Sequence, residues 1–356
     1  MALSLSFAFA EPSQPTTPER FGESVQRLRT EHEARAVLAG LWVGREPLAK
    51  IALGTSMTGV PATTDMSVRI GGISQTFLGT LVMKLVEEGH FSLDDKISRW
   101  LPDLLQAENV TVGMLLNNTA GYKDYVRDPQ AVERITADPF AHFSAQEIVD
   151  TAVAGGDMNF SPGKTQEYSH TEFTILGQVM EKATGKTMPA LYQEYLFEPL
   201  QLERTGYSVT AEMPEPVLHS YSTDRGVYED STFWEPSWAG ESGPLYSTLD
   251  DLGKWGPVFG RGEMLSPKAF QTLLQRPVSG GKDNLYFAAG FVVANDWYFQ
   301  NPNINGYTGV MGYLPEKDLT LVVFATRPQE GETVHPAFAI FQQLVRELTP
   351  EHPLPF

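Results

Sequence analysis

The sequence contains no cysteine, which excludes disulfide frameworks, thiol nucleophiles and thiolate metal sites. Its 7 histidines never occur in an H-x-x-x-H or H-E-x-x-H spacing, so we expect no zinc site, no other metal and no cofactor. Basic residues are scarce as well, with 26 Lys and Arg against 44 Asp and Glu. The net charge of −18 would repel phosphate groups, which disfavours binding to nucleic acid and to anionic membrane surfaces.

Long apolar runs are also missing, because no internal segment approaches the ~20 apolar residues that span a bilayer. The first ten residues, MALSLSFAFA, are apolar and end in an A-x-A pattern like that of a secretory signal, without its basic leader. If this tract is a signal remnant, the protein is extracytoplasmic or secreted; if it is only a tail, the protein is cytoplasmic. We expect residues 1–18 to form a flexible N-terminus or signal remnant.

The residues that are present are typical of a folded globular protein. Apolar residues make up 42% of the chain and aromatic residues 11%, which excludes a disordered protein. With 356 residues the chain is longer than one ordinary domain. A single mixed fold with an inserted subdomain is as consistent with this length as two independent units.

Hydrophobic periodicity predicts strands at both ends of the chain and helices between them. A helix over residues 21–33 precedes two short apolar runs, 36–43 and 48–53, whose separation by a four-residue turn suits a hairpin. Further strands are predicted over 286–295, around 297–300 and over 319–326, and a last helix over about 335–348. We therefore expect a mixed α and β fold whose sheet is assembled from the two ends of the chain.

The most informative stretch is residues 69–102, RIGGISQTFLGTLVMKLVEEGHFSLDDKISRWLP. Apolar residues recur there at helical spacing, and Gly89 occupies the position favoured for a left-handed C-cap. The stretch resembles the active-site helix of the serine β-lactamase and D-alanyl-D-alanine carboxypeptidase superfamily, whose pattern is close to RIGS-x-x-K-T/S-F followed by LVEEGKLSLDDPV. A second segment, VTVGMLLNNTAGYKDY at 110–125, resembles the family's ITVRHLLSHTSGLPDY. The resemblance extends over residues 19–348.

This resemblance implies one β-lactamase/transpeptidase-like unit with an antiparallel sheet flanked by helices. Residues 19–73 and 256–350 would form the sheet-containing α/β part, and residues 74–255 an inserted all-helical domain. In the family a serine on the first helix is acylated, and a lysine one turn later moves its proton. In this chain the two positions fall on Gly72 and Gln75. Gly72 carries no nucleophile, and Gln75 forms hydrogen bonds but carries no proton at neutral pH.

The second family motif, Y-x-N, corresponds to Tyr168-Ser169-His170. The resemblance makes Tyr168 a proton carrier and places His170 where the family has an asparagine that points into the cleft. An imidazole there titrates near neutral pH, so we predict Tyr168 and His170 as the catalytic pair. The alternative for His170 is a satisfied structural histidine.

The third motif, K/H-T-G, aligns with Tyr307-Thr308-Gly309, and the family histidine of the LLSHTSG segment with Asn118. We therefore predict six ligand-binding residues in one cleft: Gly72, Gln75, Asn118, Tyr307, Thr308 and Gly309. Tyr307 replaces a basic residue, which removes a charge that would attract a substrate carboxylate. The alternative is that Tyr307 is simply a strand-forming residue.

Three serines are alternative nucleophiles. Ser74 follows Gly72 by two residues and would face away from the site on a helix. Ser161 opens an S-x-x-K match that contains Pro162 and Gly163 and is therefore expected to be a loop. Ser242 lies in GESGP, which lacks the final glycine of a nucleophile elbow, and we expect it to be structural.

Three functions remain open from the sequence. The first is a non-acylating member of the fold that binds a small-molecule or peptide-like ligand and transfers protons through Tyr168 and His170. The second is an active serine hydrolase, namely an esterase, carboxypeptidase or β-lactamase, that uses another nucleophile. The third is a non-catalytic binding protein. The sequence favours the first, because four site positions have changed together while the surrounding motifs remain.

Overall fold

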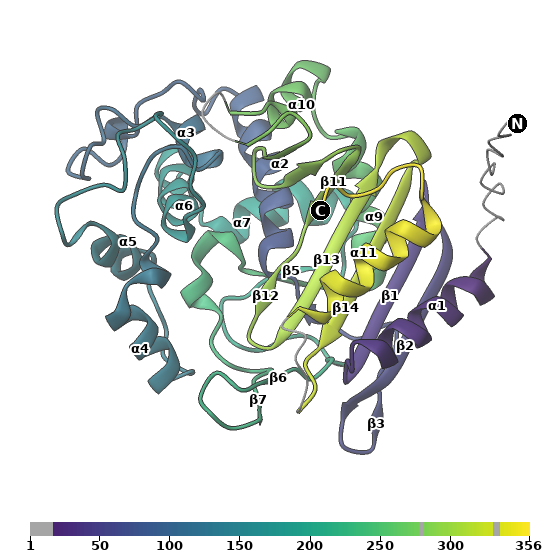
Figure 1. Ribbon diagram of the computed structural model, residues 1–356. Helices are drawn as coiled ribbons and strands as arrows, with labels where there is room; N and C mark the ends of the chain where they lie inside the picture. Colours follow the sequence, from purple (N-terminus) through teal and green to yellow (C-terminus); the bar gives the residue numbers. More distant parts are fainter. Residues whose placement is uncertain (1–16, 278–280, 330–334) are drawn as a thin grey trace, which may run out of the picture.

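The computed structural model describes residues 17–277, 281–329 and 335–356 (Figure 1). The tract interpreted as a signal remnant lies outside these described residues. The helices are α1 (Pro18–Glu31), α2 (Ser74–Glu87), α3 (Val112–Leu116), α4 (Pro129–Ala137), α5 (Ala145–Val153), α6 (His170–Thr184), α7 (Met188–Tyr192), α8 (Glu198–Leu200), α9 (Leu249–Arg261), α10 (Pro267–Leu274) and α11 (Pro336–Leu348). In the described parts of the chain, no helix is long and apolar enough to cross a membrane.

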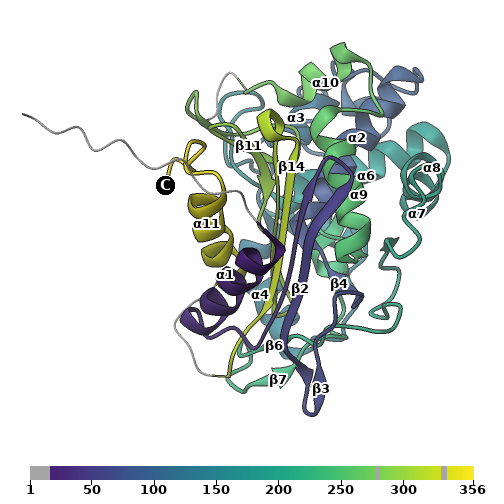
Figure 2. The same cartoon turned by 90° about the vertical axis from the view of Figure 1, so that its right-hand side faces the viewer.

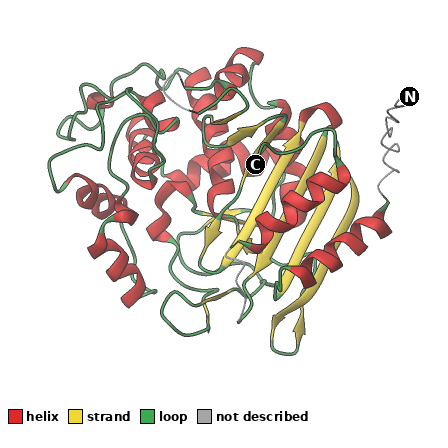
Figure 3. Ribbon diagram, in the orientation of Figure 1, coloured by secondary structure: helices red, strands yellow, loops and turns green. Residues whose placement is uncertain are grey.

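A nine-stranded antiparallel sheet forms the centre of the sheet-containing part (Figure 3). Its strand order is β3-β2-β1-β14-β13-β11-β10-β9, and β12 pairs with β13 beside this path. The strands are β1 (Ala36–Val43), β2 (Glu46–Met57), β3 (Val60–Pro61), β9 (Leu285–Phe287), β10 (Val292–Ala294), β11 (Trp297–Gln300), β12 (Asn303–Ile304), β13 (Tyr307–Leu314) and β14 (Leu319–Thr326).

The two ends of the chain meet in this sheet. β1 pairs antiparallel with β14, and Gly40 lies opposite Val322 in the register. The N-terminal hairpin therefore lies in the same sheet as the C-terminal strands, and the predicted fold class is confirmed. Every residue of β13 and β14 is buried, since helices cover both faces of the sheet.

Two layers of helices enclose the sheet, as the side view shows (Figure 2). α1 and α11 lie on one face, where Phe21 of α1 and Phe341 of α11 are completely buried with the strands. α9 packs on the opposite face against β1, β13 and β14. The approach of α9 is close, because a Cβ on Gly253 would lie 2.2 Å from the Trp42 ring.

The region 74–255 contains most of the remaining helices but is not entirely helical. Within it, the short strands β8 (Leu245–Ser247) and β5 (Gly206–Tyr207) form a three-stranded sheet with β4 (Val68–Arg69), which precedes the region, and β6 (Tyr221–Ser222) pairs with β7 (Glu229–Asp230). α2 is almost fully buried and runs between the helical region and the sheet layer. The short 3-10 turn η1 (Gly71–Ile73) precedes α2 and places Gly72 at its N-terminal end.

Candidate functional site

A cavity of about 300 Å³ lies at the N-terminal end of α2. The loop before α6, the turn η5 (Ser237–Ser242) and the end of β11 supply its other walls. Among the described residues its lining consists of Gly71, Gly72, Gln75, Tyr168, His170, Trp238, Ala239, Ser242, Gly243, Phe287, Val292, Gln300, Asn301, Pro302, Asn303 and Ile304. Four predicted site residues, Gly72, Gln75, Tyr168 and His170, are thus brought together.

Gly72 opens this cavity without contributing a side chain. A Cβ built on Gly72 would meet Gln300 Oε1 at 3.4 Å and Gln75 Nε2 at 3.6 Å, which are ordinary van der Waals distances. The backbone there is not in the left-handed region, so an L side chain fits without strain. Glycine is therefore not required for the fold at this position, and its effect is to leave the site without a hydroxyl.

Gln75 is held by a network of side-chain amides. Its Nε2 donates to Tyr168 Oη at 2.6 Å and to the Ser242 carbonyl at 3.1 Å. Its Oε1 accepts a hydrogen bond from Gln300 Nε2 at 2.8 Å, and the same Gln300 nitrogen donates to the Gly290 carbonyl at 2.7 Å. Both Gln75 donors and its acceptor are engaged, so this residue orients its neighbours and takes no proton.

Tyr168 lines the cavity beside Gln75, and its side chain is partly accessible there. Burial raises the pKa of the Tyr168 phenol well above its usual value of 10, and the neighbouring Ser242 side chain and the hydrogen bond from Gln75 oppose this only in part. Tyr168 therefore remains protonated at neutral pH. In this state it can donate a proton or a hydrogen bond, but it does not act as a base.

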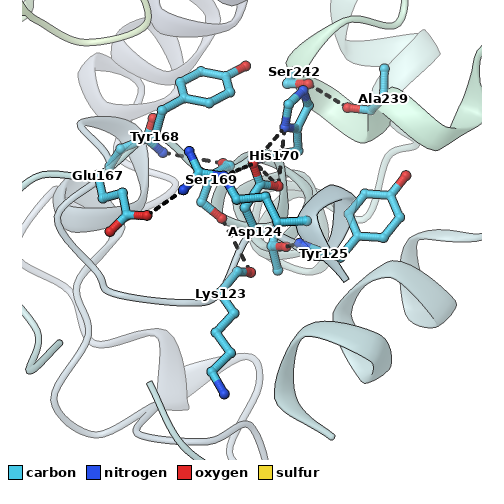
Figure 4. Close-up of polar contacts among 12 residues, drawn as sticks. Lys123, Asp124, Tyr125, Glu167, Tyr168, Ser169, His170, Ala239 and Ser242 are labelled. Carbon is cyan, nitrogen blue, oxygen red and sulfur yellow. Dashed lines mark hydrogen bonds and ion pairs between the residues drawn. The ribbon is translucent and has the colours of Figure 1, made fainter. Parts of the chain in front are cut away.

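His170 is paired with a carboxylate that the sequence analysis did not single out. Its Nδ1 lies 3.2 and 3.1 Å from the two carboxylate oxygens of Asp124, and its backbone N–H donates to Asp124 Oδ1 at 3.2 Å (Figure 4). The Asp124 side chain is 4% exposed and that of His170 20%. Because a carboxylate accepts, Nδ1 carries the hydrogen, and Nε2 is left as the basic ring nitrogen. The His170 ring stands edge-on to Tyr168, with centroids 5.0 Å apart.

The loop that carries Asp124 is held by a buried carboxyl group. Glu172 accepts hydrogen bonds from the backbone N–H groups of Ala120, Gly121 and Tyr122 at 2.7 to 3.2 Å. Burial raises the pKa of Glu172 to about 8, although these N–H groups act in the other direction. Glu172 follows His170 by two residues on α6. The start of this helix therefore positions both His170 and the loop that carries Asp124.

The expected position of the third motif is corrected by the structure. Tyr307 is 1% exposed and its hydroxyl donates to the Leu218 carbonyl, while Thr308 is fully buried and donates to the Ala325 carbonyl. Gly309 is buried on the same strand. None of the three belongs to the described lining of the cavity, because β12, which pairs with Tyr307 and Thr308, and the end of β11 line it instead. The residue that contacts Gln75 from the sheet is Gln300.

Asn118 is likewise placed outside the cavity lining. It is completely buried, has a positive φ of 55°, and donates from Nδ2 to the Ser169 carbonyl at 3.4 Å. Its backbone carbonyl accepts from Glu167 N at 3.1 Å. Asn118 therefore supports the turn before α6 from behind. Asparagine suits this position since it tolerates the left-handed region better than most residues.

The alternative serines differ in their access to the cavity. Ser74 is completely buried, and its Oγ accepts from Leu245 N at 3.2 Å. Ser161 is exposed in a loop and does not line the cavity. Ser242 does line it, but it is 2% exposed and its hydroxyl donates to the Ala239 carbonyl at 2.5 Å.

Metal ligands do not gather at this site. No group of three or more His, Asp or Glu side chains in residues 17–277, 281–329 and 335–356 has a geometry that could hold a metal ion. The carboxylate nearest to His170 is already engaged by the histidine ring and backbone. The arrangement can therefore bind a polar ligand, donate a proton from Tyr168 and accept one at His170.

Comparison with known proteins agrees with this fold. The Beta-lactamase family profile matches residues 21–344, so the chain belongs to the Beta-lactamase family. Penicillin-binding protein 4 of Amycolatopsis lactamdurans is 29% identical over 289 residues, covering 75% of this chain and 72% of that protein. Protein flp of Staphylococcus aureus strain MW2 is 21% identical over 284 residues, and the matched segment covers 76% of this chain but only 55% of flp.

Solved structures show the same architecture. A D-stereospecific amidohydrolase from Streptomyces sp. superposes with a TM-score of 0.81 over 92% of this chain and 99% of that one, at 22% identity. At this level of identity the similarity establishes the fold alone. The class of the chain is thus that of the β-lactamase-fold serine hydrolases, and the chemistry of its own site has to be derived from the residues in the cavity.

Proposed function

We propose that this member of the Beta-lactamase family is non-acylating, that it binds a small organic or peptide-like ligand in the cavity, and that it transfers protons through His170 and Tyr168. The observation that carries the proposal is the amide network around Gln75, which occupies the place of the family's Ser and Lys pair. Gly72 supplies no nucleophile, and Gln75 uses both of its N–H donors and accepts from Gln300 through Oε1. An acyl intermediate needs both an activated hydroxyl and a base.

The proton-transfer part of the proposal rests on two groups in opposite states. The raised pKa of Tyr168 keeps its phenol protonated, so in the proposal it donates a hydrogen bond to the bound molecule as a proton moves. His170 is oriented by Asp124 through Nδ1, which leaves Nε2 as the acceptor. With ring centroids 5.0 Å apart, both groups can reach one bound molecule.

Ligand binding supplies the test, with D-phenylalanine amide as the first probe because aromatic residues line the cavity and a structural relative is named a D-stereospecific amidohydrolase. Affinity is measured by calorimetry for the wild type, Tyr168→Phe and His170→Asn. We expect both substitutions to weaken binding by about threefold to tenfold, the loss of one hydrogen bond. Unchanged affinity in both variants would contradict the proposal.

Hydrolysis through Ser242 is the second candidate. It is favoured by one observation, namely that Ser242 is the serine among the described lining residues. Against it, the hydroxyl donates to the Ala239 carbonyl, and the nearest amide, Gln75, contacts the Ser242 backbone rather than its hydroxyl. If Ser242 is the nucleophile, Ser242→Ala should abolish hydrolysis. If the proposed function is correct, Ser242→Ala should leave ligand binding unchanged.

A further inference from the structure

A second cavity of about 450 Å³ adjoins the site cavity. Trp238 and Asn303 line both cavities, so they form a shared wall. The Trp238 ring lies 6.2 Å from the ring of His170 and donates from Nε1 to Asn305 Oδ1 at 3.1 Å, on the side of the second cavity. We call this second cavity the second compartment, and define it by Phe143, Arg225, Trp234, Trp238, Asn303 and Arg327.

One side of the second compartment is apolar and preformed. Phe143 and Trp234 are 6% and 8% exposed, and Ile135 of α4 completes this side. Tyr125 stacks obliquely on Phe143 and holds it from behind. A flat or aliphatic group that enters here would replace water against rigid aromatic surface, which favours burial of an apolar ligand segment.

Three acidic residues line the second compartment, and two of them, Glu235 and Asp138, already have donors, whereas Asp224 is 60% exposed and lies 3.7 Å from Arg327. Glu235 accepts a hydrogen bond from Ser237 N at 3.2 Å and lies 3.4 Å from His142 Nδ1. Asp138 accepts from Phe140 N at 3.1 Å. These carboxylates are engaged by the protein itself, so they are poor candidates for binding a cationic ligand.

The two arginines are paired much less closely. Arg327 Nη1 is 3.7 Å from Asp224, and Arg327 Nε has no hydrogen-bond partner among the described residues although it is buried. Arg225 Nε is 3.6 Å from Glu229. Both separations exceed a hydrogen-bond distance, and a buried guanidinium N–H without an acceptor carries an uncompensated cost of desolvation. Arg327 and Arg225 both line the second compartment, and a ligand carboxylate there would accept hydrogen bonds from the accessible parts of their guanidinium groups.

We propose that the second compartment binds the carboxylate end of an elongated, partly apolar ligand, with Arg327 and Arg225 as its anion contacts. The apolar segment of the ligand lies against Phe143 and Trp234, and the other end passes Trp238 to reach His170. The inference rests on the proposed function for the identity of the site at that other end. What the inference adds is that the protein prefers a ligand with a terminal carboxylate. The residues of the site cavity do not set this preference.

The test compares phenylalanyl-phenylalanine with its C-terminal amide, using calorimetry at fixed pH and salt. These two probes differ only in the charged end. For the wild type we expect the acid to bind about tenfold more tightly than the amide, the size of one charge-assisted hydrogen bond. In Arg327→Gln this preference disappears, while the affinity for the amide is unchanged. Arg225 is more exposed, so we expect Arg225→Gln to reduce the preference for the acid by a smaller factor. This variant also provides the test if Arg327→Gln fails to fold.

Arg99→Gln is the matched control, because Arg99 is 62% exposed, pairs with Asp95 within the same turn and lines neither cavity. We expect it to retain the full preference for the acid. Equal affinity of the wild type for acid and amide, no binding of either dipeptide, or an unchanged preference in both compartment variants would overturn the inference. His170→Asn tests the proposed function separately. If the preference for the acid over the amide depends on Arg327, the second compartment is supported, whether or not His170→Asn weakens binding.

Discussion

The side-chain amide of Gln75 donates a hydrogen bond to the phenol of Tyr168, with 2.6 Å between Nε2 and Oη. A neutral amide in this place fixes the position of the tyrosine but cannot exchange a proton with it. The same amide accepts from Gln300, so it bridges α2, the loop before α6 and the end of β11. The cavity is therefore ordered without a charged base next to Gly72, and the proton chemistry is left to His170 and Tyr168.

Restoring the hydroxyl alone is expected to have little effect on hydrolysis. Gly72→Ser fits the available space, since its Cβ would meet Gln300 and Gln75 at 3.4 and 3.6 Å, but Gln75 cannot deprotonate the serine. Gly72→Ser/Gln75→Lys should hydrolyse p-nitrophenyl esters faster than Gly72→Ser by orders of magnitude, because removal of one member of a nucleophile and base unit costs up to about 10⁶ in rate. Equal rates for the single and double variants would show that the base lies elsewhere.

The pairing of His170 with Asp124 predicts that the carboxylate orients the imidazole for ligand binding. Asp124→Asn keeps a side chain of similar shape but removes the charge that orients the ring, so it should weaken the binding of D-phenylalanine amide, measured by calorimetry, by a smaller factor than His170→Asn does. Both variants should keep the melting temperature within a few degrees of wild type. Wild-type affinity in both variants would reduce His170 to a packing residue.

The fold could be predicted from the sequence because its local signals agree. The runs at 36–43 and 319–326 are apolar apart from Thr320 and Thr326, as expected of strands buried on both faces, and the structure places them side by side. The short strands β5 to β8 were not predicted, since segments of two or three residues carry no periodic signal. Their pairing depends on tertiary contacts that the local sequence does not encode.

Glu172 should be important for stability, because three buried backbone N–H groups of residues 120–122 have its carboxyl as their acceptor. Glu172→Ala leaves these donors unsatisfied and should lower the free energy of unfolding by about 3 kcal/mol or more, as measured by urea denaturation. Glu167→Ala is the control, since Glu167 forms only an exposed ion pair with Arg127 and should contribute at most about 1 kcal/mol. Similar losses in the two variants would contradict the assigned role of Glu172.

Because Glu241 is buried, we predict that the free energy of unfolding of the protein falls as the pH rises. Burial raises its pKa from 4.5 to about 8, because only Tyr207 donates to its carboxyl group and Oε2 has no hydrogen-bond partner in the described part of the chain. Between these two pH values the folded protein retains the proton and the unfolded chain releases it, so ionisation opposes folding by up to about 1.4 kcal/mol per pH unit. Urea unfolding of Glu241→Gln should show a shallower decline between pH 5 and 8 than the wild type. A parallel decline in the two proteins would show that Glu241 is not the group responsible.

The site was predicted in part. Gly72, Gln75, Tyr168 and His170 were found because each falls on a family motif of fixed spacing next to a helix, and the structure brings all four to one cavity. Tyr307 was predicted to lie in the cleft because the T-G pair that follows it on β13 resembles the third motif. The residue beside Gln75 is instead Gln300, at the end of β11. No T-G pair follows Gln300, so the motif could not indicate it. Asp124 lay within the GYKDY segment, but its pairing with His170 across 46 positions depends on the fold.

Intact-protein mass spectrometry after exposure to an excess of a reactive β-lactam such as nitrocefin shows whether the family's acyl-serine chemistry is absent. The wild type should show its unmodified mass at all times, because Gly72 offers no hydroxyl and the cavity's Ser242 is bonded to a backbone carbonyl. Gly72→Ser/Gln75→Lys, measured in parallel, should gain the mass of one opened β-lactam. A stoichiometric adduct on the wild type that is lost in Ser242→Ala would contradict the account and identify the protein as a serine acyl-enzyme with a relocated nucleophile.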